Sequence, residues 1–196
     1  GFSIFGSKRC YALREDMSLD LEAVESFLEK AGDGPVLVFG FTYMIWKYFY
    51  EPLKKSGHKL HLEHGFMIHG GGWKKLANEA VTAEQFRDGL REVCGILDVR
   101  NYYGMAEQTG CIYMECECGH LHASSYSDVL IRNMEDFSCC KNGTEGVIQV
   151  LTPMAWSYPG HSILTEDKGM ILGEDDCPCG RKGKYIRITG RIPKAE

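Results

Sequence analysis

The sequence predicts an α/β fold in which a mostly parallel sheet with flanking helices is followed by a small β-rich, barrel-like subdomain. Over the first half of the 196-residue chain, runs with strand character alternate with runs of helical spacing, and this alternation is typical of a parallel sheet covered by helices. After Gly110 the runs are short and strand-like, with turn residues between them, as in a small barrel or sandwich. We therefore expect two subdomains, 1–110 and 111–196.

The first elements have clear signals. Residues 19–32 carry apolar side chains on one helical face and stop at Gly32, which predicts a helix. The continuous apolar run 35–41 predicts a strand covered on both faces. Helical spacing follows from residue 41 and ends near Gly57. The aromatic stripe of this helix is interpreted as core packing rather than as the wall of an acyl tunnel.

Strand signals dominate the rest of the chain. Residues 59–72 predict a strand that runs into a glycine loop, and residues 96–103 predict a further strand. Between them, Thr82 and Gln85 have the spacing of a capping box for a helix through about residue 93. The second half has only short strand-like runs: IYMEC, YSDVLIRN, EGVIQVLT, SILTEDKGMIL and KYIRIT. The polar segments 165–169 and 189–196 are interpreted as turns that end two of these strands.

Composition excludes some classes of function. The net charge is −5 with acidic residues spread along the chain, which argues against a nucleic-acid partner held by phosphate contacts. The most apolar stretch, 36–46, is too short to span a bilayer, and the N-terminus shows no charged-then-apolar leader. We therefore expect a soluble, cytoplasmic protein. Nine cysteines are an odd number, so a framework of disulfides is the weaker interpretation of them.

Two Cys-x-Cys-Gly turns, in ECECGHLH (115–122) and DDCPCGRKG (175–183), stand 60 residues apart. Glycine after the second cysteine lets the backbone turn so that both sulfurs face one point, and two such turns would form a tetrahedral thiolate site suited to zinc. A Cys-His-Cys-Cys set that uses His122 is an open alternative, and a third is four reduced surface thiols. A closed site would be structural. The candidate ligands are Cys116, Cys118, His122, Cys177 and Cys179.

The segment HGGGWKK (69–75) follows a predicted strand, as phosphate-binding loops do, but it lacks the spacing of a Walker loop. Its consecutive glycines, Gly70, Gly71 and Gly72, allow a flat ring or another backbone to come close. The alternative is a tight connection with Trp73 packed on the core. Histidines 58, 61 and 64 alternate along the predicted strand and are more typical of structure than of catalysis.

The segment NYYGMAEQTG (101–110) is either an ordinary strand-to-loop turn or a loop that presents an aromatic face and a carboxylate to a ligand. Its place in the chain decides, because a glycine loop precedes it and a Thr-x-Asp-x-Gly segment and a Gly-Arg pair follow. This order resembles that of the adenylate-forming ligases. The motif sequences are most similar to those of the lux-type acyl-protein synthetases: HGGGWKK, YGMAEQTG, SYPGHSILTEDKG and CGRKGKYIRITGRIPKAE. The Cys-x-Cys-Gly-Arg turn resembles the phenylacetate–CoA ligase branch.

The resemblance implies a place in the large N-terminal domain of such an enzyme, and an ATP site. Tyr103 would stack on adenine, Glu107 would be catalytic by holding Mg²⁺, Asp167 would accept bonds from the ribose hydroxyls, and Arg191 would reach ribose or phosphate. Gly104 and glycines 70–72 would complete the nucleotide site. Ala106 and Glu166 depart from the family pattern, which has threonine and glycine at these positions.

The resemblance also implies the reaction. The enzyme would activate a long-chain fatty acid with ATP, pass the acyl group to a protein cysteine thiol, and work with an acyl-protein reductase. The alternatives are an aryl- or fatty-acyl-CoA ligase and a zinc-stabilised binding module without turnover. The sequence contains neither the family's phosphate loop before residue 69 nor its C-terminal lysine domain, so we expect the isolated chain to be inactive.

Overall fold

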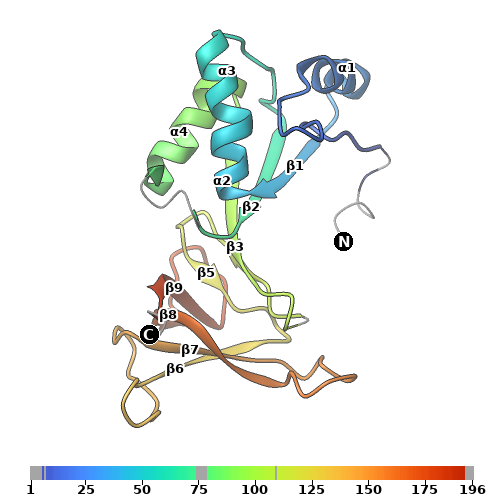
Figure 1. The fold of residues 1–196 in the computed structure, drawn as a ribbon. Helices are drawn as coiled ribbons and strands as arrows, with labels where there is room; N and C mark the ends of the chain where they lie inside the picture. Colours follow the sequence, from blue (N-terminus) through green and yellow to red (C-terminus); the bar gives the residue numbers. More distant parts are fainter. Residues whose placement is uncertain (1–5, 7, 74–78, 109, 193–196) are drawn as a thin grey trace. The chain divides into compact units, whose positions relative to one another are not determined.

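The computed structural model describes residues 6, 8–73, 79–108 and 110–192 (Figure 1). The chain forms two compact units, Gly1–Arg100 and Asn101–Glu196, and each is described by itself. The subdomain boundary predicted at residue 110 stays a prediction. Among the described residues, no helix combines the length and the apolar character that crossing a bilayer requires.

The first unit has the predicted α/β character. Strand β1 pairs with β2 in parallel, from Val36 opposite Gly65 to Phe41 opposite Gly70. Helical segments precede and follow these two strands in the chain (Figure 1). In chain order the elements are α1 (Leu21–Ala31), β1 (Val36–Phe41), α2 (Thr42–Met44), η2 (Ile45–Tyr50), α3 (Glu51–Ser56), β2 (Gly65–Gly70), α4 (Ala83–Cys94) and the start of β3 (Asp98–Tyr103).

The helix ends follow the sequence signals. Thr82 accepts a hydrogen bond from the backbone N–H of Gln85, and the Gln85 side chain accepts one from the backbone N–H of Thr82, so the predicted capping box is confirmed. Gly57 and Gly95 end α3 and α4 with φ of 69° and 70°. Only glycine adopts this left-handed conformation without steric cost.

The predicted helix from residue 41 to Gly57 is present as one helical stretch with a π-helical segment, η2, in its middle. Its aromatic stripe packs in the core of the unit. Trp46 stacks on Tyr50 and on Phe86 of α4, with ring centroids 4.0 and 5.8 Å apart. A Cβ at Gly89 would press against the Tyr50 ring, so this glycine allows α4 to approach η2 closely.

Two expectations for the first unit are wrong. Strand β1 is not covered on both faces, because Leu37, Phe39 and Phe41 are 41%, 46% and 44% exposed. An uninterrupted apolar run in the sequence does not determine whether one or both faces of the strand are buried. The strand expected from residue 59 begins only at Gly65. In the preceding segment, the backbone N–H groups of Leu60 and Leu62 bond to the end of α4 instead.

The second unit is rich in β structure, as predicted, and its strands pair antiparallel. Its strands are β4 (Tyr113–Glu115), β5 (Leu121–His122), β6 (Asp128–Arg132), β7 (Gly146–Leu151), β8 (Ser162–Glu174) and β9 (Lys184–Arg191), and β3 runs into it from the first unit. Their hydrogen-bonded order is β3-β4-β5-β9-β8-β7-β6. The core lies between these strands and includes Tyr113, Val129, Ile148 and Ile186.

Residues 165–169 correct the prediction of a turn, because they lie inside the long strand β8. The turn predicted for 189–196 is wrong for residues 189–191, which end β9, and residues 193–196 lie outside the described part of the chain. The irregularity that the glycine signals is a shift in the pairing of β8 with β9 between Lys168 and Gly169. A Cβ at Gly169 would overlap the backbone carbonyl oxygen of Arg187. The glycine therefore marks a close approach of two strands rather than a chain reversal.

Candidate nucleotide and metal sites

Tyr103, Asp167 and Arg191, which come from three strands of the second unit, lie in direct contact. Asp167 of β8 is the register partner of Arg191 of β9, and Tyr103 is the last residue of β3. The Tyr103 hydroxyl donates a 2.8 Å hydrogen bond to Oδ2 of Asp167, and Nε of Arg191 lies 3.3 Å from its Oδ1. Sheet register pairs Asp167 with Arg191, and the Tyr103 hydroxyl reaches Asp167 from β3, a strand that is not adjacent to β8 in the sheet.

The environment of the Tyr103 hydroxyl keeps it protonated. Burial, together with the hydrogen bond to Asp167, raises the pKa of Tyr103 well above its usual value, so the phenol keeps its proton and stays a donor. The Asp167 side chain is 18% exposed, whereas Arg191 is 72% exposed. The backbone N–H of Asp167 donates to the Thr165 hydroxyl, which in turn donates to the backbone carbonyl of Ile148. Asp167 is therefore a largely buried carboxylate with an exposed cation, Arg191, at its outer edge.

The loop after Tyr103 leaves Glu107 at the surface. Gly104 and Glu107 are exposed, whereas the Gln108 side chain is buried. Turn hydrogen bonds run from the backbone N–H of Gln108 to Met105 and from that of Cys111 to Gln108. Within the described residues Glu107 forms no ion pair or hydrogen bond, so its carboxylate is available to a ligand.

The glycine loop belongs to the first unit. Gly70 ends β2, and Gly71 has φ of 75°, which turns the chain away from the strand. Among the described residues other than its two chain neighbours, no atom lies within 4 Å of a Cβ built at Gly72. Trp73 packs against the core, with its ring 6.1 Å from that of Trp46. The loop is thus open at Gly72 and anchored by Trp73, which combines features of both interpretations of its sequence.

The sequence interpretation missed two residues beside this loop. Thr42 and His69 are buried and hydrogen-bonded to each other, and Thr42 also bonds to the carbonyl oxygen of Gly70. A signal was present, because one polar residue follows the apolar run of β1 directly and the other interrupts the apolar run of β2 just before the glycines.

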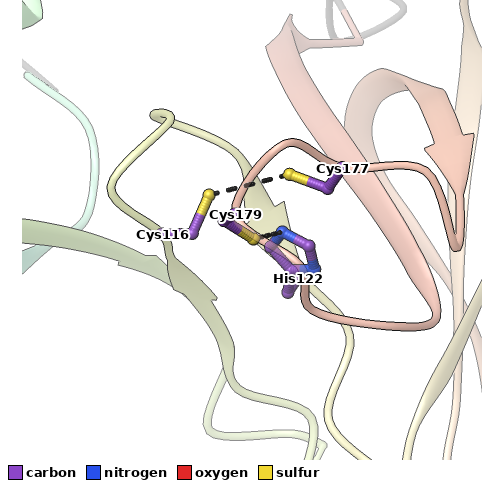
Figure 2. Close-up of side chains that lie close together, drawn as sticks. All are labelled: Cys116, His122, Cys177 and Cys179. Atoms are coloured by element: carbon purple, nitrogen blue, oxygen red, sulfur yellow. Dashed lines mark hydrogen bonds between the residues drawn. The ribbon is translucent and has the colours of Figure 1, made fainter.

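Cys116, His122, Cys177 and Cys179 converge in the second unit, and their ligand atoms all lie within 4.8 Å of one another (Figure 2). The Sγ atoms of Cys116 and Cys177 are 4.0 Å apart, and Sγ of Cys179 is 3.4 Å from Nε2 of His122. Tetrahedral zinc with ordinary bond lengths requires sulfur–sulfur separations of about 3.8 Å and sulfur–nitrogen separations of about 3.6 Å. The donor set and its spacing therefore fit a zinc ion.

Local backbone structure forms this cluster. Gly119 and Gly180 have φ of 76° and 81°, and their N–H groups bond back to the carbonyls of Cys116 and Cys177, closing the two turns. Cys118 is exposed and lies outside the group. Of the two ligand sets left open by the sequence, the structure brings together the one that contains His122.

Neighbouring groups suit metal binding. Burial, reinforced by the charge of Arg181, lowers the pKa of His122, which favours the neutral imidazole that ligates metals. Burial raises the pKa of the Cys177 thiol to about 12, so a nearby cation is needed to make it a thiolate. Nδ1 of His120 lies 3.2 Å from Sγ of Cys177, and the ring of His120 stacks on Tyr185. His120 is thus placed to support a ligand sulfur from outside the cluster.

Comparison with known proteins agrees with the order of motifs. Residues 3–196 match the family model described as acyl-protein synthetase, LuxE. A search of curated proteins found no match. Similar solved structures include a 2-hydroxyisobutyryl-CoA ligase (17% identity, TM-score 0.65) that the chain matches over 87% of its own length and 36% of the other's.

A long-chain-fatty-acid–CoA ligase from Archaeoglobus fulgidus has 16% identity and a TM-score of 0.60, over 88% of this chain and 37% of that one. The amide bond synthetase McbA from Marinactinospora thermotolerans has 17% identity and a TM-score of 0.56, over 87% and 34%. At these identities the likeness establishes the fold alone, that of the large domain of adenylate-forming enzymes. The chain spans about a third of the length of these structures.

Proposed function

Because the chain belongs to the LuxE family of acyl-protein synthetases, we propose that it is the nucleotide- and acyl-binding portion of an AMP-forming ligase. The substrate is a long-chain fatty acid. Its carboxylate oxygen bonds to the α-phosphorus of ATP, the bond from that phosphorus to the bridging oxygen breaks, and pyrophosphate leaves. A protein cysteine thiol then attacks the acyl carbon, AMP leaves, and the thiol proton passes to solvent.

The observation that carries the proposal is the contact among Tyr103, Asp167 and Arg191. The Tyr103 ring offers a face to adenine, and the bond from its hydroxyl orients the carboxylate of Asp167. An ionised carboxylate has about four lone-pair positions, so Asp167 can bind Tyr103 and Arg191 and still accept from ribose hydroxyls. Arg191, on the exposed side, can reach ribose or phosphate.

Glu107 holds magnesium in this proposal. Mg²⁺ takes one or two protein carboxylates and keeps phosphate oxygens and water as its other ligands, which suits one exposed carboxylate after the tyrosine. The ion would neutralise charge on the phosphates. The family resemblance assigns Gly70, Gly71, Gly72 and Gly104 to nucleotide binding, where the absence of a side chain would let the base approach the backbone of each.

Zinc has a structural role in this proposal, held by Cys116, His122, Cys177 and Cys179. A site with all four positions filled by protein has none left for substrate. It joins the 116–122 turn, which follows β4, to the 177–180 turn, which lies between β8 and β9. Strands β8 and β9 carry Asp167 and Arg191, so the metal stabilises the register that brings this pair together.

The test uses the complete gene product that contains this sequence, incubated with labelled tetradecanoic acid and Mg-ATP, with and without CoA. Label that remains on the protein through a denaturing gel and is released by hydroxylamine supports the proposal. Label found only in acyl-CoA identifies a CoA ligase instead, and no ATP-dependent label in either form identifies a binding module. An acyl-protein reductase is the expected consumer of the acyl group, and its addition should deplete the label on the protein.

A further inference from the structure

Two buried polar side chains of the first unit, Thr42 and His69, have no part in the chemistry described above. Thr42 directly follows β1 and is 7% exposed. His69 is the second-to-last residue of β2, next to the glycine loop, and is 8% exposed. Burial of unpaired polar groups costs about 1–3 kcal/mol each, so their partners indicate what the pair does.

Hydrogen-bond geometry fixes which atom of the pair donates. Oγ1 of Thr42 lies 2.9 Å from Nδ1 of His69 and 3.2 Å from the carbonyl oxygen of Gly70. A hydroxyl carries one proton, and a carbonyl oxygen can only accept. Thr42 therefore donates to Gly70 and accepts from His69, which must carry its proton on Nδ1. The bonds run in one direction, from His69 through Thr42 to Gly70.

The surroundings of His69 keep this arrangement in one state. Its ring centroid lies 4.6 Å from that of Phe86 on α4. Burial, followed by the charge of Arg87, lowers the pKa of His69 to about 4, so the imidazole is neutral near pH 7. A neutral ring that donates from Nδ1 leaves Nε2 without a proton.

The carbonyl that receives the last bond stands at the start of the glycine loop. Gly70 is the register partner of Phe41, the residue before Thr42, and Gly71 then turns the chain with positive φ. The hydroxyl of Thr42 thus holds the peptide between Gly70 and Gly71 at the point where the backbone leaves the strand. A glycine-rich segment has no side chains of its own to define its path.

We propose that Thr42 and His69 are positioning residues that hold the glycine loop in the conformation that receives the flat base of a nucleotide. This inference rests on the proposed function, since it needs ATP to bind at the loop. Both residues act through the backbone of Gly70.

The hydrogen-bond direction is tested by nitrogen NMR of the histidine-labelled chain at pH 7. We expect His69 to carry its proton on Nδ1 in the wild type and in Thr42→Ser, which keeps the hydroxyl. Thr42→Val, which has nearly the same shape without the hydroxyl, should lose this preference. A proton on Nε2 in the wild type would overturn the inference, whatever the reaction of the protein.

The role in nucleotide binding is tested on the complete gene product by measuring KM for ATP and for the fatty acid. Loss of one net hydrogen bond predicts a rise in KM for ATP of about three- to tenfold in Thr42→Val, with KM for the fatty acid unchanged and Thr42→Ser close to wild type. His61→Gln, a change at an 84% exposed side chain of the same unit, is the matched control for histidine replacement and should equal wild type, whereas His69→Phe should follow Thr42→Val.

An unchanged KM for ATP in Thr42→Val, or an equal rise in both KM values, overturns the inference while the proposed function stands. A wild-type enzyme that neither binds nor uses ATP overturns the proposed function and the nucleotide role of the pair together. In that case the NMR result still reports the hydrogen-bond direction by itself.

Discussion

The hydroxyl of Tyr103 donates a 2.8 Å hydrogen bond to the carboxylate of Asp167, and so joins the end of β3 to the interior of β8. The aromatic ring and the carboxylate are thus held together before a ligand binds. Preorganisation of this kind lowers the conformational cost of binding. Because the Tyr103 hydroxyl is bonded to Asp167, the proposed function assigns contact with the nucleotide base to the Tyr103 ring rather than to its hydroxyl.

The two functions of Tyr103 can be separated by substitution. Tyr103→Phe removes the hydroxyl and keeps the ring, so we expect the second unit to lose about 0.5–1.5 kcal/mol of stability while most of the affinity for ATP remains. Tyr103→Ala should lose both. Urea unfolding and ATP titration of each variant measure the two effects. Equal losses of ATP affinity in the two variants would show that the hydroxyl, not the ring, makes the contact.

The group of Cys116, His122, Cys177 and Cys179 predicts which cysteines are needed for zinc binding. Purified protein should hold one zinc ion per chain, measured by elemental analysis. Cys116→Ser and Cys177→Ser should reduce the zinc content severely and lower the thermal midpoint, because a structural zinc contributes folding free energy directly.

Cys118→Ser is the matched control, since Cys118 lies in the same turn as Cys116 but is exposed and outside the cluster. We expect it to keep both the zinc and the wild-type thermal midpoint. Loss of zinc in Cys118→Ser with retention in His122→Gln would instead identify the four-cysteine site.

Much of the fold follows from local signals in the sequence. The α1 and α4 helices were predictable because caps and stop glycines are local features, as with Thr82 and Gln85 of α4 and Gly32 of α1. The two Cys-x-Cys-Gly turns were predictable for the same reason, since each is complete within four residues. What local sequence does not contain is pairing across the sheet.

The errors arise where tertiary context decides. Gly169 was interpreted as a turn residue, but its function is to admit the backbone of Arg187 from β9, a strand that begins 15 residues later. His122 rather than Cys118 joins the cluster. His122 lies on β5, opposite Tyr185 of β9, and the local sequence does not contain this pairing, so it leaves the choice open. Thr42 and His69 are 27 residues apart, and only the parallel register of β1 and β2 brings them together.

His69 predicts a pH-dependent stability of the first unit. Its pKa is about 4 in the folded chain against 6.5 as the ordinary value, so between these pH values the unfolded chain binds a proton that the folded chain does not. Stability must then fall as the pH drops from 6.5 towards 4, by about 2 kcal/mol between pH 7 and pH 5.

Urea unfolding at several pH values measures this dependence. His69→Asn, which keeps a donor without a titrating ring, should flatten the dependence by that amount, whereas the exposed control His61→Gln should leave it unchanged. If wild type and His69→Asn showed the same dependence of stability on pH, His69 would bind a proton as readily in the folded chain as in the unfolded chain, and the prediction would be wrong.

Glu107 offers the sharpest test of the reaction itself, because its side chain is exposed and forms no bond within the part of the chain that the structure describes. Glu107→Gln removes the charge that would hold Mg²⁺ and changes little else, so stability should stay within about 0.5 kcal/mol of wild type. Acid-dependent ATP–pyrophosphate exchange by the complete gene product should fall by about a hundredfold or more, as expected when a charge that stabilises the transition state is lost.

The exposed Glu135→Gln, on the β6–β7 connection, controls for loss of a surface carboxylate and should keep full exchange. Full exchange in Glu107→Gln would exclude Glu107 as the magnesium ligand, and a drop in stability would show that its carboxylate supports the loop instead.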